Sequence, residues 1–426
     1  MIGRAHHTRV AQFRIEIEPR DALVDEAVAF RVLGCPPGQP VAVRARMADY
    51  LGRAWESRAT FRADARGCVD LGTTRPEAGS YDAVDAMGLF WSMAADAEPA
   101  AALFDSPAPL EVRVDAEAAG GASASAVARR RFAARGVARD EVRDEGVVGS
   151  LFRPSGAGPH PAVIVLGGSS GDVWEAHAAL LASRGFAALA LAYFGVPSLP
   201  ARLAEIPLEY FRSAIGWLRR RDGIDPGTVA VLGGSRGGEL ALLLGATFPE
   251  VHAVVAYMPS GVLWEGMGAP GKRPASWTLG GEARPFLRRR DEVIDWQHSP
   301  IALTPGFLAA LQDEAAVSEA AIPVERTHGP VLLLSGGDDR MWPSAPLAEI
   351  AMERLRKRGF GYPFEHLSYG GAGHLLVTPP NLPATIDRAR HPFARLDFAF
   401  GGSPAAEAAA RADAWPRVIA WLRRFL

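Results

Sequence analysis

Apolar and polar residues alternate along the first third of the chain. The alternating segments cover residues 13–17, 28–32, 41–47, 55–61 and 110–114. A period of two is typical of strands that bury one face and expose the other to water. Clusters rich in Gly, Pro and Asp separate these segments at intervals of about ten to fifteen residues. The pattern predicts an N-terminal all-β, immunoglobulin-like sandwich.

The pattern changes near residue 138, where apolar runs begin to alternate with amphipathic segments. The run 162–166 is unbroken and apolar, as expected of a strand that is covered on both faces. Further predicted strands cover 186–194, 229–232, 254–258, 331–334 and 364–369, and predicted helices cover 174–184, 208–221, 237–248 and 408–426. This alternation predicts a mostly parallel sheet with helices on both faces.

We therefore predict two domains, a β-sandwich over residues 1–138 and an α/β domain over residues 139–426. Residues 116–128 are rich in Ala, Gly and Ser. Such a composition favours a flexible hinge or a long hairpin loop.

The motif Gly233-Gly234-Ser235-Arg236-Gly237 lies between a predicted strand and a predicted helix. A Gly-x-Ser-x-Gly sequence in that context is typical of the nucleophile elbow of α/β-hydrolases. The glycines remove side chains that would collide in the tight turn. The turn also directs the N–H of Arg236 and the positive end of the helix dipole towards an anion beside the serine hydroxyl.

A serine nucleophile needs a base and an acid, which follow it in the order acid, then histidine, in this fold. We favour Asp339 as the acid, because its Gly-x-x-Asp-x-x-x-Pro spacing is usual for the acid turn, and we expect Asp338 to cap that turn. His374 follows the last predicted strand on a glycine-rich loop and is the candidate base. His366 lies within the strand and is interpreted as structural, and His391 lacks a comparable loop.

A second oxyanion donor is expected directly after the strand 162–166. Gly168 and Ser169 both fit this position. A phosphate-binding loop is the alternative, but no Gly-Lys-Ser/Thr follows. Asp172 comes soon after, and its charge would oppose a polyanionic ligand if it faced one.

Composition and charge narrow the classes of partner. The 426 residues carry a formal net charge of −2, which gives no basic footprint for nucleic acid. No apolar run approaches the length needed to cross a bilayer, and the first 20 residues lack the apolar core of a secretory signal. The two cysteines provide neither a disulfide framework nor a zinc site. We therefore expect a cytoplasmic protein without a membrane partner, metal or cofactor.

Taken together, these motifs resemble the acyl-CoA thioesterase and bile acid-CoA:amino acid N-acyltransferase family over nearly the whole chain. The matching segments include 22–26, 34–38, 79–93, 191–194, 234–240, 337–342, 371–375, 401–403 and 413–415. The resemblance implies a β-sandwich joined to an α/β-hydrolase domain. It also implies a Ser/Asp/His or Cys/Asp/His triad acting on acyl-CoA thioesters, which falls on Ser235, Asp339 and His374.

The nucleophile separates the branches of this family. The resemblance implies Cys in enzymes that pass the acyl group to an amino acid and Ser in thioesterases, so Ser235 favours hydrolysis. We predict a serine-dependent hydrolase of acyl thioesters carried on CoA or on a carrier-protein arm. The alternatives are an acyltransferase with an amine or alcohol acceptor, an ester or dienelactone-type hydrolase, and a non-catalytic binding protein.

Two segments are too long to be simple connections between strands. Residues 259–328 contain Trp264, Trp277, Phe286, Trp296 and Phe307, and residues 377–400 directly follow the histidine loop. Each could form a wall of the acyl pocket or be an ordinary packed insertion.

Overall fold

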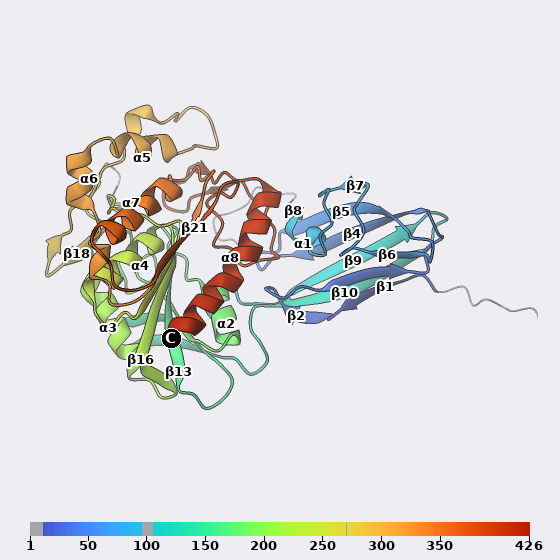
Figure 1. Cartoon of the computed structure of the whole chain (residues 1–426), viewed down its shortest axis with the longest axis horizontal. Helices are drawn as coiled ribbons and strands as arrows, with labels where there is room; N and C mark the ends of the chain where they lie inside the picture. The colour runs from blue at the N-terminus through green and yellow to red at the C-terminus, as the bar shows by residue number, and fades with distance from the viewer. Residues whose placement is uncertain (1–11, 96–104, 270) are drawn as a thin grey trace, which may run out of the picture. The chain divides into compact units, whose positions relative to one another are not determined.

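The computed structural model describes residues 12–95, 105–269 and 271–426, which fall into two units (Figure 1). Of these residues, 12–95, 109–131 and 381–385 belong to the first unit, and the remainder belongs to the second. The prediction that no secretory signal is present concerned the first 20 residues. Residues 1–11 of that segment are outside the described residues.

Two β-sheets build the first unit. The smaller has the order β1-β3-β6, and the larger has the order β2-β10-β9-β4-β5-β7, with β8 also paired to β5. The elements are β1 (Arg14–Glu18), β2 (Asp21–Leu23), β3 (Ala29–Leu33), β4 (Pro40–Ala48), β5 (Ala54–Arg62), β6 (Cys68–Asp70), β7 (Ala78–Gly79), α1 (Gly88–Trp91), β8 (Ala94–Ala95), β9 (Leu110–Ala118) and β10 (Ser123–Arg131).

Burial alternates strictly along the long strands of this unit. In β4, Val41, Val43 and Ala45 are buried, whereas Arg44 and Arg46 are exposed. The predicted strand-rich domain is confirmed. The immunoglobulin-like arrangement fits only weakly, because three strands lie in one sheet and seven in the other.

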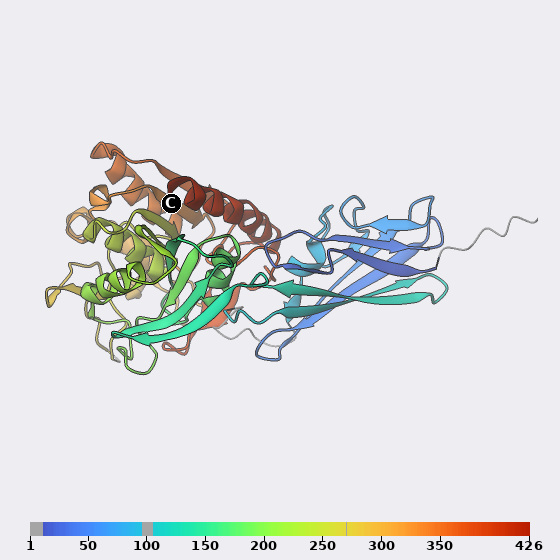
Figure 2. The same ribbon diagram turned by 90° about the horizontal axis from the view of Figure 1, so that it is seen from below.

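The prediction of a flexible hinge or a long hairpin loop over residues 116–128 is correct only in that a hairpin lies there, because its loop is short and no hinge is present. The antiparallel strands β9 and β10 run through this segment, with Ala116 opposite Ala124, as the teal ribbon in Figure 2 shows. Ala116, Ala126 and Ala128 are buried. Small side chains therefore serve here as the inward positions of two strands rather than as a flexible linker.

An eight-stranded sheet forms the centre of the second unit, with the order β11-β12-β14-β13-β16-β17-β20-β21. β11 pairs antiparallel with β12, and β12 pairs antiparallel with β14, whereas the other neighbours are parallel. The strands are β11 (Ala138–Asp144), β12 (Val147–Arg153), β13 (His160–Leu166), β14 (Ala187–Leu191), β16 (Ile224–Gly234), β17 (Ala253–Tyr257), β20 (Val331–Gly336) and β21 (Phe364–Tyr369). The predicted α/β fold is confirmed.

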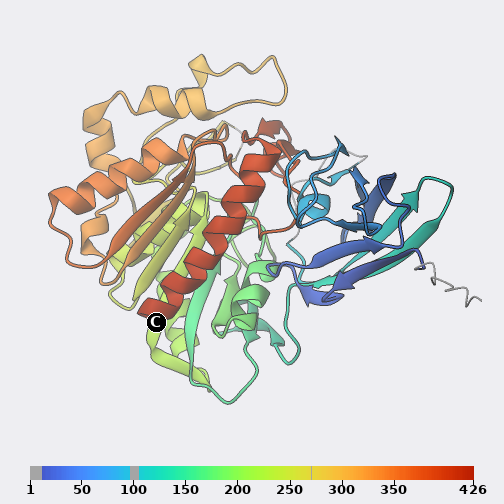
Figure 3. The same ribbon diagram turned by 45° about the vertical axis from the view of Figure 1, so that its right-hand side comes forward.

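Helices cover both faces of this sheet. α2 (Glu175–Ser183) and α8 (Pro404–Phe425) pack on one face, and α8 passes in front of the strands in Figure 3. α3 (Leu208–Arg219), α4 (Arg236–Thr247) and α7 (Ser344–Lys357) pack on the other. β14, β17 and residues 162–166 of β13 are apolar and buried throughout, as a sheet covered on both sides requires.

The segment between β17 and β20 forms irregular structure beyond the edge of the sheet where the parallel strands end. It contains β18 (Trp277–Leu279), β19 (Glu282–Ala283), η1 (Asp291–Val293), α5 (Thr304–Ala310), α6 (Glu314–Ala320) and η2 (Val324–Arg326). The short strand β15 (Ile206–Pro207) pairs with β18. β22 (Arg388–Arg390) and β23 (Asp397–Ala399) form a two-stranded sheet. Within the part of the chain that is described, no helix is long and apolar enough to cross a membrane.

Candidate active site

Ser235 occupies a tight turn between β16 and α4. Its backbone has φ 58° and ψ −122°, a left-handed conformation that is costly for a residue with a side chain. The turn is fixed by a hydrogen bond from the Ser235 N–H to the Tyr257 carbonyl oxygen at 3.0 Å. A Cβ added at Gly233 would lie 2.1 Å from the Gly237 carbonyl oxygen. The glycines of the motif are therefore needed for the close approach of strand and helix.

The structure brings the three residues predicted as nucleophile, base and acid into one hydrogen-bonded chain. His374 Nε2 lies 3.0 Å from Ser235 Oγ. His374 Nδ1 lies 2.9 and 3.0 Å from the two carboxylate oxygens of Asp339. The Asp339 side chain is fully buried, and 7% of the His374 side chain is exposed. The hydroxyl of Ser235 and the carboxylate of Asp339 therefore lie on opposite sides of one imidazole ring, and the carboxylate is shielded from water.

Asp339, and not Asp338, faces the histidine. Asp339 Oδ1 also accepts hydrogen bonds from the N–H groups of Met341 and Trp342, which hold the carboxylate in place. Asp338 instead accepts a hydrogen bond from the N–H of Gly402 at 3.0 Å. The two neighbouring aspartates thus point to different partners.

Close backbone contact joins the acid turn to the histidine loop. A Cβ added at Gly336 would lie 2.4 Å from the carbonyl oxygen of Gly373. The N–H of His374 donates to the Phe400 carbonyl oxygen at 2.9 Å, and the imidazole stacks on the Phe400 ring. These contacts fix the imidazole between Asp339 and Ser235.

Backbone N–H groups near the serine are available as oxyanion donors. Gly168 lies beside the elbow, since a Cβ added there would be 3.4 Å from Ser235 Cβ. Among the described residues, neither Gly168 nor Arg236 donates its N–H to a protein acceptor. Tyr193 Oη donates to the Gly167 carbonyl oxygen at 2.6 Å and so supports the loop. Gly168 and Ser169 both remain candidates for the second donor.

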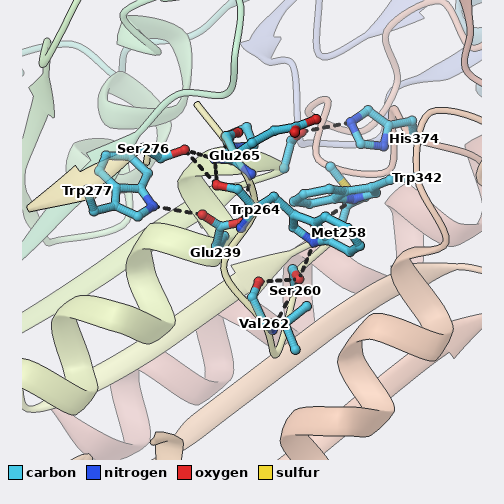
Figure 4. A network of polar contacts seen from close by, with 12 residues as sticks. Glu239, Met258, Ser260, Val262, Trp264, Glu265, Ser276, Trp277, Trp342 and His374 are labelled. Carbon is cyan, nitrogen blue, oxygen red and sulfur yellow. Dashed lines mark hydrogen bonds and ion pairs between the residues drawn. The ribbon is translucent and has the colours of Figure 1, made fainter. Parts of the chain in front are cut away.

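The Arg236 side chain is part of a buried network around Glu239. Figure 4 shows Glu239 together with Ser276 and Trp277 of this network. The Arg236 guanidinium pairs with Glu239 at 2.8 Å and donates to Ser276 Oγ. Glu239 also accepts hydrogen bonds from the Trp277 indole at 2.7 Å and from the Trp264 N–H at 3.2 Å. The network therefore links the helix after the nucleophile to the long insertion. Burial outweighs these favourable contacts and raises the pKa of Glu239 to about 7.

Two cavities open beside Ser235. The larger, of about 550 Å³, is walled by Trp264, Trp296 and Phe307 of the insertion and by Phe393 and Phe398 of the segment after the histidine. Trp277 and Phe286, the other two aromatics of the insertion, pack against the core. Both long segments thus contribute walls, and the insertion is partly ordinary packing as well.

Five cationic side chains line the larger cavity, and one of them is Arg236, which pairs with Glu239. Arg273 pairs with Glu265 and Asp291, and Arg289 pairs with Asp291. Arg202 and Lys272 have no acidic partner within the described part of the chain. These two positive charges are therefore available to an anionic ligand.

The smaller cavity, of about 110 Å³, contains two carboxyl groups, Asp105 and Asp172, together with Trp174 and His177. Burial raises the pKa of Asp172, and burial together with the charge of Asp172 raises that of Asp105. A raised pKa lowers the charged fraction of each carboxyl.

Sequence reasoning missed two features of the site. The Glu239 network joins residues that lie 25 and 38 positions apart in the sequence. An acidic residue in an apolar helix directly after the elbow was a signal that could have indicated it. His391, to which we assigned no role, lies with Nε2 3.2 Å from Ser169 Oγ. This contact joins residues 222 positions apart, and no local sequence pattern predicts it. By contrast, His366 bonds to Ser335 within the sheet, in line with its structural interpretation.

Comparison with known proteins identifies the family. Residues 25–144 match the N-terminal region of the acyl-CoA thioester hydrolase/BAAT family, and residues 206–426 match its C-terminal region. Acyl-coenzyme A thioesterase 6 of Mus musculus is 32% identical, over 94% of each chain. Acyl-coenzyme A amino acid N-acyltransferase 1 of Mus musculus is also 32% identical, over 96% of each chain.

Among solved structures, a puromycin-hydrolyzing peptidase of Mycobacterium tuberculosis superposes with a TM-score of 0.44 at 16% identity, covering 89% of this chain and 53% of that one. The family matches span both units and agree with the motifs on which the resemblance was based. The chain belongs to the family of acyl-CoA thioester hydrolases and bile acid-CoA:amino acid N-acyltransferases.

Proposed function

We propose that the chain is a serine-dependent acyl thioester hydrolase that works through an acyl-enzyme intermediate. Its family membership makes it an enzyme of the acyl-CoA thioesterase and acyltransferase type. One observation carries the finer proposal: Asp339, His374 and Ser235 are linked by hydrogen bonds of 2.9 to 3.0 Å at a strained elbow.

The reaction begins with His374 as general base. Its Nδ1–H donates to Asp339, which leaves the Nε2 lone pair to accept the Ser235 proton. The serine oxygen attacks the thioester carbonyl carbon, and the carbonyl π-electron pair moves to oxygen. The resulting imidazolium is stabilised by the buried carboxylate of Asp339.

The oxyanion is held by the N–H of Arg236 and by that of Gly168 or Ser169, each contributing on the order of 3 kcal/mol. When the intermediate collapses, the C–S bond breaks and the imidazolium gives its proton to the thiolate. Water then attacks the ester on Ser235, with His374 again acting as base. The free acid leaves, and the serine is restored.

The larger cavity supports a thioester with an anionic carrier. Arg202 and Lys272 offer unpaired positive charge, and the aromatic walls offer apolar surface. CoA and the arm of a carrier protein both carry phosphate, so both fit this chemistry. We propose an acyl thioester of one of these carriers as the substrate.

Transfer to an amine is the second candidate, favoured by the similarity to an N-acyltransferase over 96% of the chain. Ser235 argues for hydrolysis, because water attacks an oxygen ester readily, whereas a Cys thioester persists and favours an amine. Product analysis with glycine, taurine and simple alcohols as acceptors separates hydrolysis from transfer. Matched oxygen-ester and thioester substrates separate the thioesterase from an esterase or a dienelactone-type hydrolase.

We also propose that the protein acts in the cytoplasm and requires no cofactor. Both Cys35 and Cys68 are free thiols, which suits a reducing compartment. Relatives include proteins named as mitochondrial and as peroxisomal. Fractionation of cells with an antibody against the chain tests the location.

The Ser235→Ala variant tests the proposed function. Removing the nucleophile should lower kcat for acyl-CoA hydrolysis by about 10⁴-fold or more, since the other members of a triad contribute little without it. A fluorophosphonate probe should label the wild type and fail to label the variant. Full hydrolysis by Ser235→Ala would overturn the proposal, and a wild type that no probe labels would favour a non-catalytic binding protein.

A further inference from the structure

His391 is a buried histidine beside the candidate active site that the mechanism above does not use. It follows β22, and only 7% of its surface is exposed. Its side chain lines both cavities that contain Ser235. Its Nδ1 faces the backbone N–H groups of Phe393 and Ala394, at 3.3 and 3.2 Å.

The contacts of Nδ1 decide the tautomer of His391. A backbone N–H can only donate, so Nδ1 is the acceptor and carries no hydrogen. Burial lowers the pKa of His391 to about 4, and the ring is therefore neutral at pH 7. The single ring hydrogen must then lie on Nε2, which is 3.2 Å from Ser169 Oγ.

The tautomer in turn decides what the Ser169 hydroxyl can do. Because Nε2 carries a hydrogen, it donates to Ser169, whose Oγ lies 3.2 Å away and whose backbone also accepts from the ring, and the Ser169 hydroxyl cannot donate back to it. The hydroxyl hydrogen of Ser169 is thus left for another acceptor. Ser169 follows Gly168, which lies against Ser235, and it lines both cavities together with the nucleophile.

We propose that the hydroxyl of Ser169 is a third oxyanion donor and that His391 is the positioning residue that aims it. This inference rests on the proposed acyl-transfer function and deepens it. The role assigned to Ser169 from the sequence involved only its backbone N–H. Here the side chain donates a hydrogen bond to the thioester oxygen as negative charge develops there.

No proton is transferred in this step. The carbonyl π-electron pair moves to oxygen when Ser235 attacks, and the Ser169 O–H donates to that oxygen without breaking. When the oxyanion collapses and the C–S bond breaks, the hydroxyl keeps its hydrogen. His391 Nε2–H donates to Ser169 Oγ throughout, which polarises the hydroxyl and strengthens it as a donor.

The first test compares Ser169→Ala with Ser169→Thr in the full-length protein, using acetyl-CoA, hexanoyl-CoA and palmitoyl-CoA. Both variants keep the backbone N–H, but only Thr keeps a hydroxyl. Ser169→Ala should lower kcat by about tenfold to 100-fold with little change in KM, because the lost bond forms in the transition state. Ser169→Thr should retain most of the activity. Equal kcat for wild type and Ser169→Ala on the best substrate would overturn the inference.

The second test asks whether His391 acts through Ser169. His391→Ala should lower kcat about as much as Ser169→Ala, and the double variant should be no slower than either single variant. His391→Gln should restore activity, since an amide can accept from the backbone and donate to Ser169. Losses that multiply in the double variant would contradict the positioning role.

Two controls separate the possible failures. Thermal unfolding reports whether His391→Ala folds; if it does not, the Ser169 pair and His391→Gln still decide the inference. A wild type that hydrolyses none of the thioesters overturns the proposed function itself. A wild type that is active, with Ser169→Ala equally active, overturns only the role of the Ser169 hydroxyl.

Discussion

The candidate site is made from two kinds of structure. Ser235, Asp339 and His374 each follow a strand of the same sheet, on turns of a few residues. The walls of the adjoining cavity come mainly from residues 259–328 and 386–400, which form short elements and irregular backbone, and Arg202 adds a further charge. The turns present the reacting groups, whereas the walls present aromatic rings and unpaired cations.

This difference separates chemistry from selectivity. Steric demands at the turns, such as the contact between Gly233 and Gly237, leave few alternative residues there. The walls must only be apolar, well packed and charged at suitable positions. We therefore expect changes in the turns to abolish turnover or folding, and changes in the walls to alter affinity for the substrate.

Substitution of the acid should have the largest effect among the turn residues after the nucleophile itself. Asp339→Asn would keep the shape but favour the wrong imidazole tautomer, so kcat should fall about 10⁴-fold. Asp338→Asn is the matched control, because an amide oxygen can still accept from the Gly402 N–H. Steady-state kinetics on an acyl-CoA measure both variants. A larger loss in Asp338→Asn would reverse the assignment of the acid.

A methyl group at Gly233 should damage the elbow. Its Cβ would lie 2.1 Å from a backbone oxygen, and Gly233→Ala should therefore lower the free energy of unfolding by about 2 kcal/mol or more. Gly361→Ala meets no atom within 4 Å and should leave stability unchanged or slightly raised. Urea unfolding gives both values. Equal stability of the two variants would show that the elbow tolerates crowding.

The network that joins the elbow to the insertion should make stability depend on pH. Burial raises the pKa of Glu239 to about 7, so the folded protein keeps a proton that the unfolded chain loses above the ordinary carboxyl value. Stability should fall as pH rises through this window and level off above pH 7, by on the order of 2 to 3 kcal/mol.

Glu239→Gln does not titrate and should lack this component of the pH dependence. Glu319→Gln, which changes an exposed glutamate of α6, is the control. Urea unfolding at pH 5 and pH 8 compares the three proteins. A fall in stability of the same size in Glu239→Gln as in the wild type would assign the pH dependence to other groups.

The smallest effect is expected in the cavity wall. Arg202→Gln should raise KM for an acyl-CoA about two- to fivefold and leave kcat unchanged, because a half-exposed charge contributes about 1 kcal/mol or less. With the same acyl group on N-acetylcysteamine, which has no phosphate, KM should not change. An equal rise in KM for both substrates would argue that Arg202 contacts the acyl group or acts through packing.

The strands and helices that position the turns could be predicted from the sequence. The strand predicted over residues 364–369 coincides with β21, and the helix predicted over 237–248 differs from α4 by one residue at each end. Long apolar runs and glycine-rich turns produce these signals locally. The hairpin β11–β12 was not predicted, because β11 is an edge strand that exposes six of its seven residues and so lacks an apolar pattern. The domain boundary near residue 138 stays a prediction.

The cavity walls were harder to predict from the sequence, for a physical reason. The contact between His391 and Ser169 and the bonds from Trp264 and Trp277 to Glu239 exist only after distant segments pack together. The composition of the wall segments indicated aromatic packing, but it did not indicate which rings face the cavity. The hinge predicted over residues 116–128 failed similarly, since pairing with β4 and β9 turned a low-complexity segment into buried strands.

Trapping the acyl group on Ser235 tests the central claim most directly. The protein is mixed with a panel of acyl-CoA thioesters, quenched in acid within the first turnovers, digested and analysed by mass spectrometry. A covalent serine nucleophile predicts that the peptide containing Ser235 gains the mass of the acyl group, and that Ser235→Ala gives no such adduct. Steady hydrolysis with no adduct on Ser235, or an equal adduct in Ser235→Ala, would contradict the account.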